Sequence, residues 1–373
     1  MPLLRSAAEE RSDLGGARLD DAQVEFVVDA GLGPLLNHIA QDDKAALSHA
    51  SRTRLAGADM AGEARYSRMV AALGEILVAH DEIAHGVTLL KGISVCRRYP
   101  RPHLRTMSDI DLLASPRVMQ HLENLLPELG YQPGEFGMGP GFYRGHHHTR
   151  PFVHPVSGVR IEVHRALFPS GRKIPDDSAL GIERARTQIV VSAFEGHEVR
   201  RFGPEMELLY IAAHWAYDLH LPLVHIGLLD ALYLIRDEGE GIDWDLIGSW
   251  FDAREVATPL CVLLGYLLQH RLIDLDPTVI TRLEGAPKCV GRTGRRALHR
   301  IVDRSLDGGL GNGSPTRDVL EIVWQALVAP ASPWTKLYTV PMDVAFPPHH
   351  PSRFSPAFQL QRFRSLFFRQ PDG

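Results

Sequence analysis

Two aspartates, Asp109 and Asp111, stand one residue apart in the apolar run "SDIDLL". In a β-strand, residues i and i+2 point to the same face, so both carboxylates would project together while Ile110 and Leu112 face the core. Close carboxylates raise each other's pKa unless a cation lies between them. Hard divalent ions such as Mg²⁺ meet that need. The pattern predicts a metal-binding strand; the alternative is one aspartate capping a turn and the other exposed to solvent.

A third carboxylate, Glu162, lies in the segment "VRIEVHRALF" (residues 159–168). The segment alternates as a strand, with Ile161 and Val163 on one side and Glu162 and His164 on the other. Three acidic side chains on one sheet face could hold two metal ions, which clamp the attacking and leaving oxygens in phosphoryl transfer.

The expected secondary structure around these carboxylates changes from helical to strand and back to helical along the chain of 373 residues. Helical periodicity dominates the first part, short strand patterns follow, and helical periodicity returns after Gly203-Pro204. We therefore predict an α+β (mixed α/β) fold, with a small mixed sheet flanked by N-terminal helices and a C-terminal helical domain. The expected divisions are residues 1–86, 87–202, 203–328 and a Pro-rich tail, 329–373.

Four stretches together resemble a known family: "LLKGISV" (residues 89–95), Arg105 followed by "SDIDLL", a helix ending in "ELGY", and "VRIEVHRAL". They are similar to a bacterial nucleotidyltransferase family, itself mostly uncharacterised, of the superfamily typified by DNA polymerase β. The resemblance covers residues 87–168, and the helical region 203–230 is in keeping with it. It implies that Asp109 and Asp111 bind Mg²⁺, with two ions expected and Mn²⁺ as an alternative. Glu162 would be a third ligand or the base for the acceptor hydroxyl.

The same resemblance assigns nucleotide-binding roles around a glycine turn. Gly92 and Ser94 lie where the superfamily holds the triphosphate, although the usual Gly-Ser pair is adjacent and this chain inserts Ile93. Lys91 precedes the glycine, as in this subfamily, and Ser108 opens the aspartate motif. A glycine turn lets backbone N–H groups approach a phosphate, and Lys91 and Arg105 could neutralise the leaving pyrophosphate. The alternatives are a solvated lysine at a strand end and a surface ion pair.

Histidines form a second group of candidates. The stretch "GHHHTRPFVHP" could supply a transition-metal site, but adjacent histidines in a strand point to opposite faces, so residues 146–148 are not expected to converge. His148 and His164 are candidates for contacting substrate or phosphate near Glu162; the alternative is an exposed or hydrogen-bonded loop histidine. His225 and Asp230, in a helical segment, are further substrate candidates; helix packing with internal hydrogen bonds is the alternative.

Composition restricts the partners. A formal net charge of −5 and the lack of a basic stripe argue against long nucleic acid as the acceptor. Three widely separated cysteines and no signal peptide favour a reducing, cytoplasmic location. The longest apolar run, residues 259–272, is too short to span a bilayer. The tail segment "FQLQRFRSLFFRQ" is expected to form a basic-aromatic helix that packs on the helical domain or contacts a membrane surface or a protein.

These observations predict an enzyme that transfers a nucleoside monophosphate from an NTP, ATP among the candidates, to a hydroxyl and releases pyrophosphate. The acceptor would be a small molecule, such as an aminoglycoside-like antibiotic, or a peptide, and the family association favours natural-product tailoring. Two alternatives stay open: a catalytically inert nucleotide-binding or toxin–antitoxin partner with the same fold, and a metal-dependent hydrolase that uses the histidine-rich loop.

Overall fold

A computed structural model describes most of the chain. The described residues are 2–9, 13–14, 16, 18–42, 47–134, 143, 146–217, 221–251, 253–285, 290–306, 320 and 323–331. The expected tail helix, residues 358–370, lies outside them. No helix among the described residues has the length and hydrophobicity needed to cross a bilayer.

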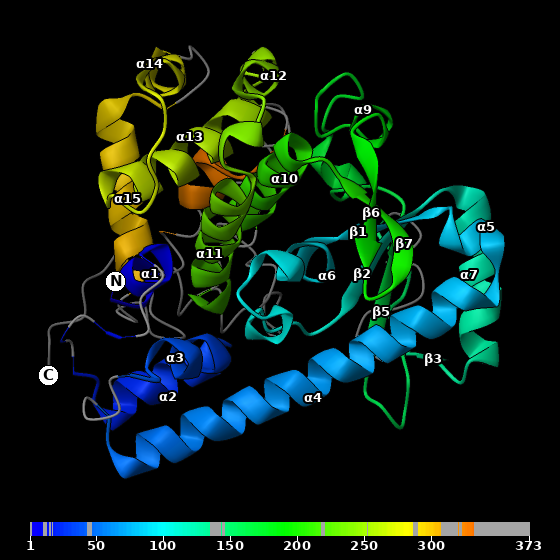
Figure 1. Ribbon diagram of the computed structural model, residues 1–373. Helices are drawn as coiled ribbons and strands as arrows, with labels where there is room; N and C mark the ends of the chain where they lie inside the picture. Colours follow the sequence, from blue (N-terminus) through cyan, green and yellow to red (C-terminus); the bar gives the residue numbers. More distant parts are fainter. Residues whose placement is uncertain are drawn as a thin grey trace, which may run out of the picture.

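A seven-stranded mixed sheet forms the centre of one half of the molecule (Figure 1). Its strand order is β3-β4-β5-β2-β1-β7-β6, with β1 antiparallel to β2 and β2 parallel to β5. Strands β6 and β7 form a hairpin, joined by a turn in which Glu195 and Gly196 both have positive φ. The strands are β1 (Val87–Leu90), β2 (Ile110–Ala114), β3 (Gln132–Pro133), β4 (Phe152–Val153), β5 (Arg160–His164), β6 (Ile189–Phe194) and β7 (His197–Phe202).

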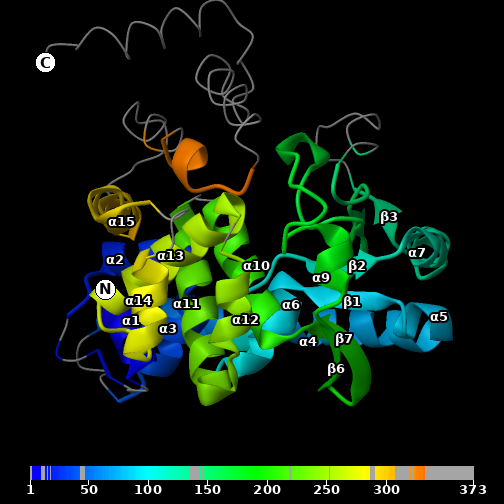
Figure 2. The same ribbon diagram turned by 90° about the horizontal axis from the view of Figure 1, so that it is seen from above.

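Helices from both ends of the chain form the other half. The N-terminal helices pack with the C-terminal ones in one hydrophobic core, and Figure 2 shows this helical body beside the sheet with α6 between them. The mixed α/β class predicted from the sequence is confirmed. The helices are α1 (Pro2–Ala8), α2 (Asp21–Asp29), α3 (Gly33–Ile39), α4 (His49–Ala79), α5 (Asp81–Ala84), α6 (Lys91–Val95), α7 (Pro116–Glu128), α9 (Ile182–Arg186), α10 (Pro204–Tyr217), α11 (Leu221–Glu238), α12 (Trp244–Ser249), α13 (Arg254–Gln269), α14 (Pro277–Gly285) and α15 (Arg292–Leu306).

The long helix α4 connects the two halves along the bottom of Figure 1. Ser48 caps its N-terminus. Leu55, in its first half, belongs to the core of the helical body, whereas Met69, Leu73 and Ile76 belong to the core under the sheet. A single helix therefore packs against both the helical body and the sheet.

Three local expectations were wrong. The turn expected at Gly92 lies one residue earlier, because Lys91 adopts φ 50° and turns the chain from β1 into α6, which includes Gly92. Cys261 is disulfide-bonded, although the wide cysteine spacing predicted reduced thiols; Cys96 is a buried free thiol. The histidines 146–148 converge, as described below, because the chain bends there instead of forming a strand.

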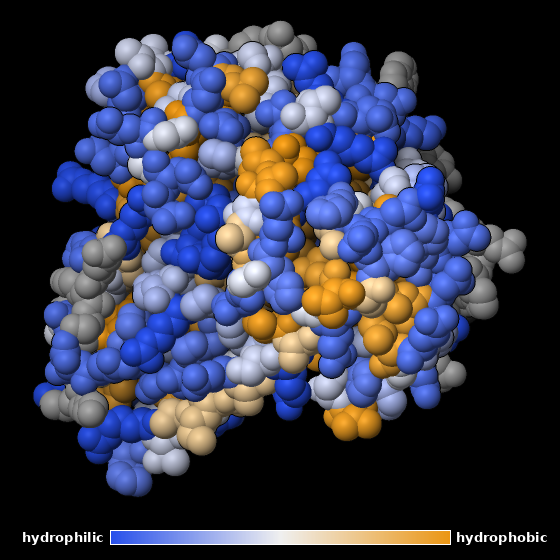
Figure 3. All heavy atoms as spheres, turned by 45° about the vertical axis from the view of Figure 1, so that its right-hand side comes forward, coloured by the Kyte–Doolittle hydropathy of each residue, from blue (hydrophilic) through white to orange (hydrophobic). Residues whose placement is uncertain are grey.

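The surface is mainly hydrophilic on the face shown in Figure 3, where hydrophobic patches are separated by polar side chains. Most large apolar side chains lie in the two cores. Val190 and Val191 are exceptions, exposed on the edge strand β6.

Candidate active site

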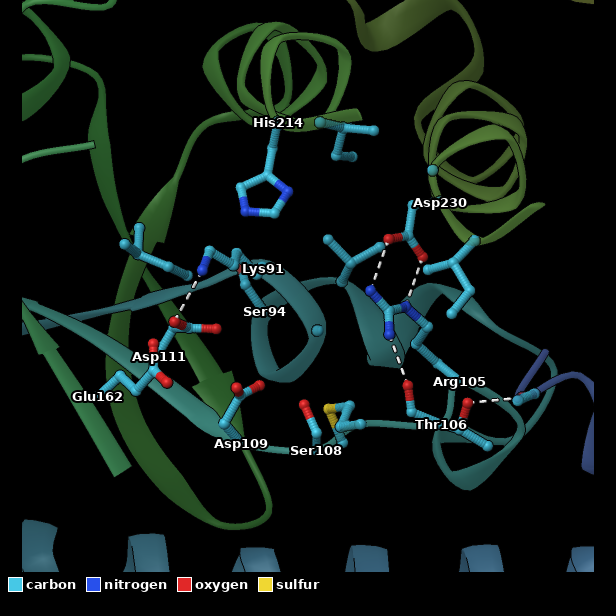
Figure 4. A pocket seen from close by; sticks show the side chains of 18 of the residues that line it. Lys91, Ser94, Arg105, Thr106, Ser108, Asp109, Asp111, Glu162, His214 and Asp230 are labelled. Carbon is cyan, nitrogen blue, oxygen red and sulfur yellow. Dashed lines mark hydrogen bonds and ion pairs between the residues drawn. The ribbon is translucent and has the colours of Figure 1, made fainter. Parts of the chain in front are cut away.

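The three predicted carboxylates meet at one end of the sheet (Figure 4). Asp111, in β2, is the direct register partner of Glu162 in β5, so the two side chains lie next to each other on neighbouring parallel strands. Asp109 immediately precedes β2, and Figure 4 shows its carboxylate below that of Asp111. Sequence alternation therefore predicted this convergence, but Asp111 is 2% exposed and lies deeper than an outer sheet face would allow.

Two cationic or polar side chains compensate Asp111. Lys91 Nζ donates to Asp111 Oδ1 at 2.9 Å, and His164 Nε2 lies 2.6 Å from the same oxygen. Burial alone would raise the pKa of the Asp111 carboxyl, but the charge of Lys91 and the hydrogen bond from His164 hold it well below its usual range. Burial lowers the pKa of His164 and keeps its imidazole neutral, so Nε2 is the protonated nitrogen that donates to Asp111.

Glu162 is compensated less completely, since the charges of Lys91 and Arg160 lower its pKa only in part. Its carboxylate accepts no hydrogen bond from the described residues, and the nearest cationic atom, Arg160 Nε, is 3.6 Å away. Burial raises the pKa of Glu162 to about 7, and the charges of Asp111 and Asp109 act in the same direction. Asp109 forms an ion pair with Arg160. Arg160 was not among the predicted site residues, although its position two residues before Glu162 places it on the same strand face.

Three consecutive histidines stand beside this carboxylate group. The ligand nitrogens of His146, His147 and His148 lie within 4.8 Å of one another, and His148 Nε2 is 3.7 Å from Glu162 Oε2. Burial is the main cause that lowers the pKa of His146 to about 4 and that of His148 to about 3. All three imidazoles line the same cavity as the carboxylates.

The helical wall of the site is held by a different kind of contact. Arg105 Nε and Nη2 donate to the two carboxylate oxygens of Asp230 at 2.8 and 2.9 Å, and the Tyr99 hydroxyl donates to Oδ1 at 2.6 Å. Arg105 and Asp230, which the sequence suggested for pyrophosphate and acceptor respectively, are thus joined to each other. This pair fixes the segment before the aspartate motif against α11 (Figure 4).

Close packing surrounds Gly92 and Ser94 in α6. A Cβ on Gly92 would lie 2.7 Å from Met107 Cγ, so no larger residue fits without displacing that side chain. The Ser94 hydroxyl donates to Glu207 Oε1 at 2.5 Å, and Glu207 also accepts from Arg98. Ser94 lines the cavity, yet its hydroxyl is engaged with the helical wall in this structure.

These groups line one cavity of about 820 Å³ between the sheet and the helical body. Its volume falls in the range of about 300–1,000 Å³ usual for small-molecule sites. His214 points into it from α10 (Figure 4). Pro34 of α3 and Ala58 and Gly62 of α4 line its far side. The sequence did not indicate this contribution of the N-terminal helices, because no motif marks it.

The remaining predicted residues differ in placement. Ser108 lies at the cavity next to Asp109, and its hydroxyl accepts a hydrogen bond from Arg160 at 3.2 Å. His225 is buried and packs edge-on against Phe26 instead of lining the cavity. The helix-packing alternative therefore describes His225 better.

The carboxylate group fits a hard divalent ion. Carboxylate oxygens of Asp111 and Glu162 lie within 4.8 Å of each other, and Asp109 adds a further carboxylate, whereas Nε2 of His164 carries the proton that it donates to Asp111. Oxygen donors of this kind suit Mg²⁺ or Mn²⁺. The raised pKa of Glu162 records an incompletely compensated repulsion that such a cation would remove.

Comparison with known proteins tests the family resemblance. The family model described as uncharacterised nucleotidyltransferase matches residues 20–272, which include β1–β7, α4, α10 and α11. No curated protein and no solved structure matches the chain. The match spans more than half of the chain and contains every carboxylate of the site. The chain therefore belongs to this uncharacterised nucleotidyltransferase family, and it is a transferase of phosphorus-containing groups.

Proposed function

We propose that the enzyme transfers a nucleoside monophosphate from an NTP to a hydroxyl of a small-molecule or peptide acceptor, with Mg²⁺ or Mn²⁺ bound at Asp109, Asp111 and Glu162. The observation that carries the proposal is the meeting of these three carboxylates with Lys91 at one end of a cavity. When bound, the metal would supply charge neutralisation at the phosphates and the carboxylates.

Glu162 is suited to act as the base. Glu162 lines the cavity beside Asp111, and a cation bound at the neighbouring carboxylates would lower its raised pKa and favour the carboxylate, the form that accepts a proton. In the proposed reaction, Glu162 takes the proton of the acceptor hydroxyl as its oxygen attacks the α-phosphorus. The bond from the α-phosphorus to the bridging oxygen breaks, and pyrophosphate leaves with the electron pair.

Lys91 and Arg105 serve different purposes in this proposal. Lys91 places an ammonium group at the carboxylates, where it can also face the triphosphate. Arg105 is a positioning residue, because its guanidinium is held by Asp230. Arg105 could contact phosphate only if that pair opened.

The cavity favours a compact acceptor. It is bounded by the sheet, by α4 and by α10 and α11, so the acceptor must fit between these elements. The net charge of −5 provides no general attraction for nucleic acid. We therefore propose a natural-product type of substrate and, because NTPs and Mg²⁺ are supplied there, a cytoplasmic site of action.

A pyrophosphate-release assay tests this function. The full chain is incubated with each NTP, Mg²⁺ and panels of hydroxylated small molecules and peptides, beside Asp109→Asn. We expect acceptor-dependent pyrophosphate release by the wild type alone, with the nucleotide attached to the acceptor by mass spectrometry. Nucleotide binding without release under any acceptor would favour the inert alternative, and equal turnover by Asp109→Asn would contradict the site.

A further inference from the structure

The three consecutive histidines form a compact group of imidazoles outside the carboxylate site. Their ring centroids are 4.2 Å apart for His146 and His147, 4.3 Å for His146 and His148, and 4.7 Å for His147 and His148. The backbone bends at residues 146 and 147, and only His148 pairs with β5, through a bridge to His164. This bend removes the alternation of a strand and turns three successive side chains to one place.

Hydrogen bonding fixes the ring orientation of His148. Its Nδ1 lies 2.6 Å from the carbonyl oxygen of Thr149, so Nδ1 donates and Nε2 keeps its lone pair. A backbone carbonyl that orients the opposite ring nitrogen is the usual arrangement of a metal-binding histidine.

The imidazole of His147 has a buried nitrogen without a hydrogen-bond partner in the described part of the chain. Its Nδ1 is buried and has no hydrogen-bond partner among the residues that the structure describes, and the same holds for Nδ1 of His164, whose ring centroid is 5.2 Å from that of His147. Buried polar atoms are rarely unsatisfied in native proteins, and exceptions often mark an ion or a water.

We propose that His146, His147 and His148 bind a borderline divalent transition metal, Zn²⁺ being the reference case, as a second metal site beside the carboxylates. Imidazole nitrogen suits Zn²⁺, Co²⁺ and Ni²⁺, whereas the oxygen donors of Asp109, Asp111 and Glu162 suit Mg²⁺. Three protein nitrogens leave one position of a tetrahedral ion open. The ion fixes this segment as the cavity wall next to Glu162.

The experiment is a Co²⁺ titration of the full chain in excess Mg²⁺, followed by visible absorption and by displacement with Zn²⁺. The parent carries His121→Ala, because His80, Glu82 and His121 form another group with metal-ligand spacing. We expect one Co²⁺ per chain with the absorption of nitrogen-bound cobalt. His147→Ala, and separately the double variant His146→Ala/His148→Ala, should each weaken binding by more than about tenfold. Asp109→Asn should bind Co²⁺ as the parent does.

Two outcomes would overturn the proposal. Unchanged Co²⁺ affinity in the histidine variants would show that these imidazoles do not ligate, and loss of the absorption in Asp109→Asn would assign the ion to the carboxylates. If the double variant does not fold, His147→Ala alone decides the question. Since the readout is metal binding, a failure of nucleotidyl transfer leaves this test unaffected.

Discussion

The two flanks of the cavity handle buried charge in opposite ways. On the helical flank, the guanidinium of Arg105 pairs with both oxygens of Asp230, and that of Arg98 donates twice to Glu207. On the sheet flank, three carboxylates share two cations. Lys91 pairs with Asp111, and the guanidinium of Arg160 lies between Asp109 and Glu162.

The difference separates structure from chemistry. Buried ion pairs with complete hydrogen bonding are self-contained, so the helical flank positions the site and needs no ligand. Among the carboxylates of the sheet flank, Glu162 has a raised pKa that an external cation would relieve, and a perturbed group of this kind in a cavity marks a functional site. Substitutions on the sheet flank should therefore abolish activity, and those on the helical flank should reduce stability.

The largest effect is expected for Asp109→Asn. Asp109 is only partly buried, so the variant should fold normally while nucleotidyl transfer falls by about 100- to 1,000-fold, the range for loss of one preorganised electrostatic contact. Turnover and thermal unfolding are measured on the same preparation. Asp111→Ala is a poorer test, because it also leaves the largely buried Lys91 without its partner. Activity within tenfold of wild type in a folded Asp109→Asn protein would remove the distinction between the flanks.

Asp230→Asn, on the helical flank, should lower the free energy of unfolding. Arg105 and Asp230 are about nine-tenths buried, and removal of one partner leaves a buried charge, at a cost of about 3–5 kcal/mol in the free energy of unfolding. Asp237→Asn is the matched control: Asp237 also pairs with an arginine but is 48% exposed, so the expected loss is below about 1 kcal/mol. Urea unfolding measures both. Equal losses in the two variants would contradict the structural role of the helical flank.

Glu162→Gln tests the pH dependence of the sheet flank. The folded-state pKa of Glu162 is raised from 4.5 to about 7, so the folded chain holds this proton more tightly than the unfolded chain does. The resulting stabilisation is full below about pH 4.5 and is lost as pH rises to about 7, on the order of 3 kcal/mol. Urea unfolding of the metal-free protein should show this decline in the wild type relative to Glu162→Gln. A pH-independent difference between the two would contradict the incompletely compensated burial of Glu162.

Gly92→Ala should cause the smallest of these losses in the free energy of unfolding. A Cβ at this position meets Met107 at 2.7 Å, and overpacking of this kind costs about 1–3 kcal/mol. Gly57→Ala in α4 is the control, because its Cβ meets nothing within 4 Å and alanine should stabilise a helix interior by about 0.5–1 kcal/mol. Calorimetric unfolding should give a lower melting temperature than that of the wild type for Gly92→Ala and a higher one for Gly57→Ala.

Local patterns predicted the chemical residues better than their surroundings. Alternation in two short strands placed Asp111 and Glu162 on one face, and the β2–β5 pairing brought them into register. The Arg105–Asp230 pair could not be predicted, since it joins residues 125 positions apart on elements whose packing no local pattern specifies. The convergence of residues 146–148 was missed because a strand was assumed where the backbone bends. The domain boundaries drawn from the sequence stay a prediction.

The most direct test is a crystal structure of the full chain with Mn²⁺ and a non-hydrolysable NTP, read by the anomalous scattering of the metal. The account predicts Mn²⁺ bound by Asp109, Asp111 and Glu162, with the triphosphate at Lys91. A nucleotide bound elsewhere, or one bound in the cavity with no Mn²⁺ at these carboxylates, would contradict it.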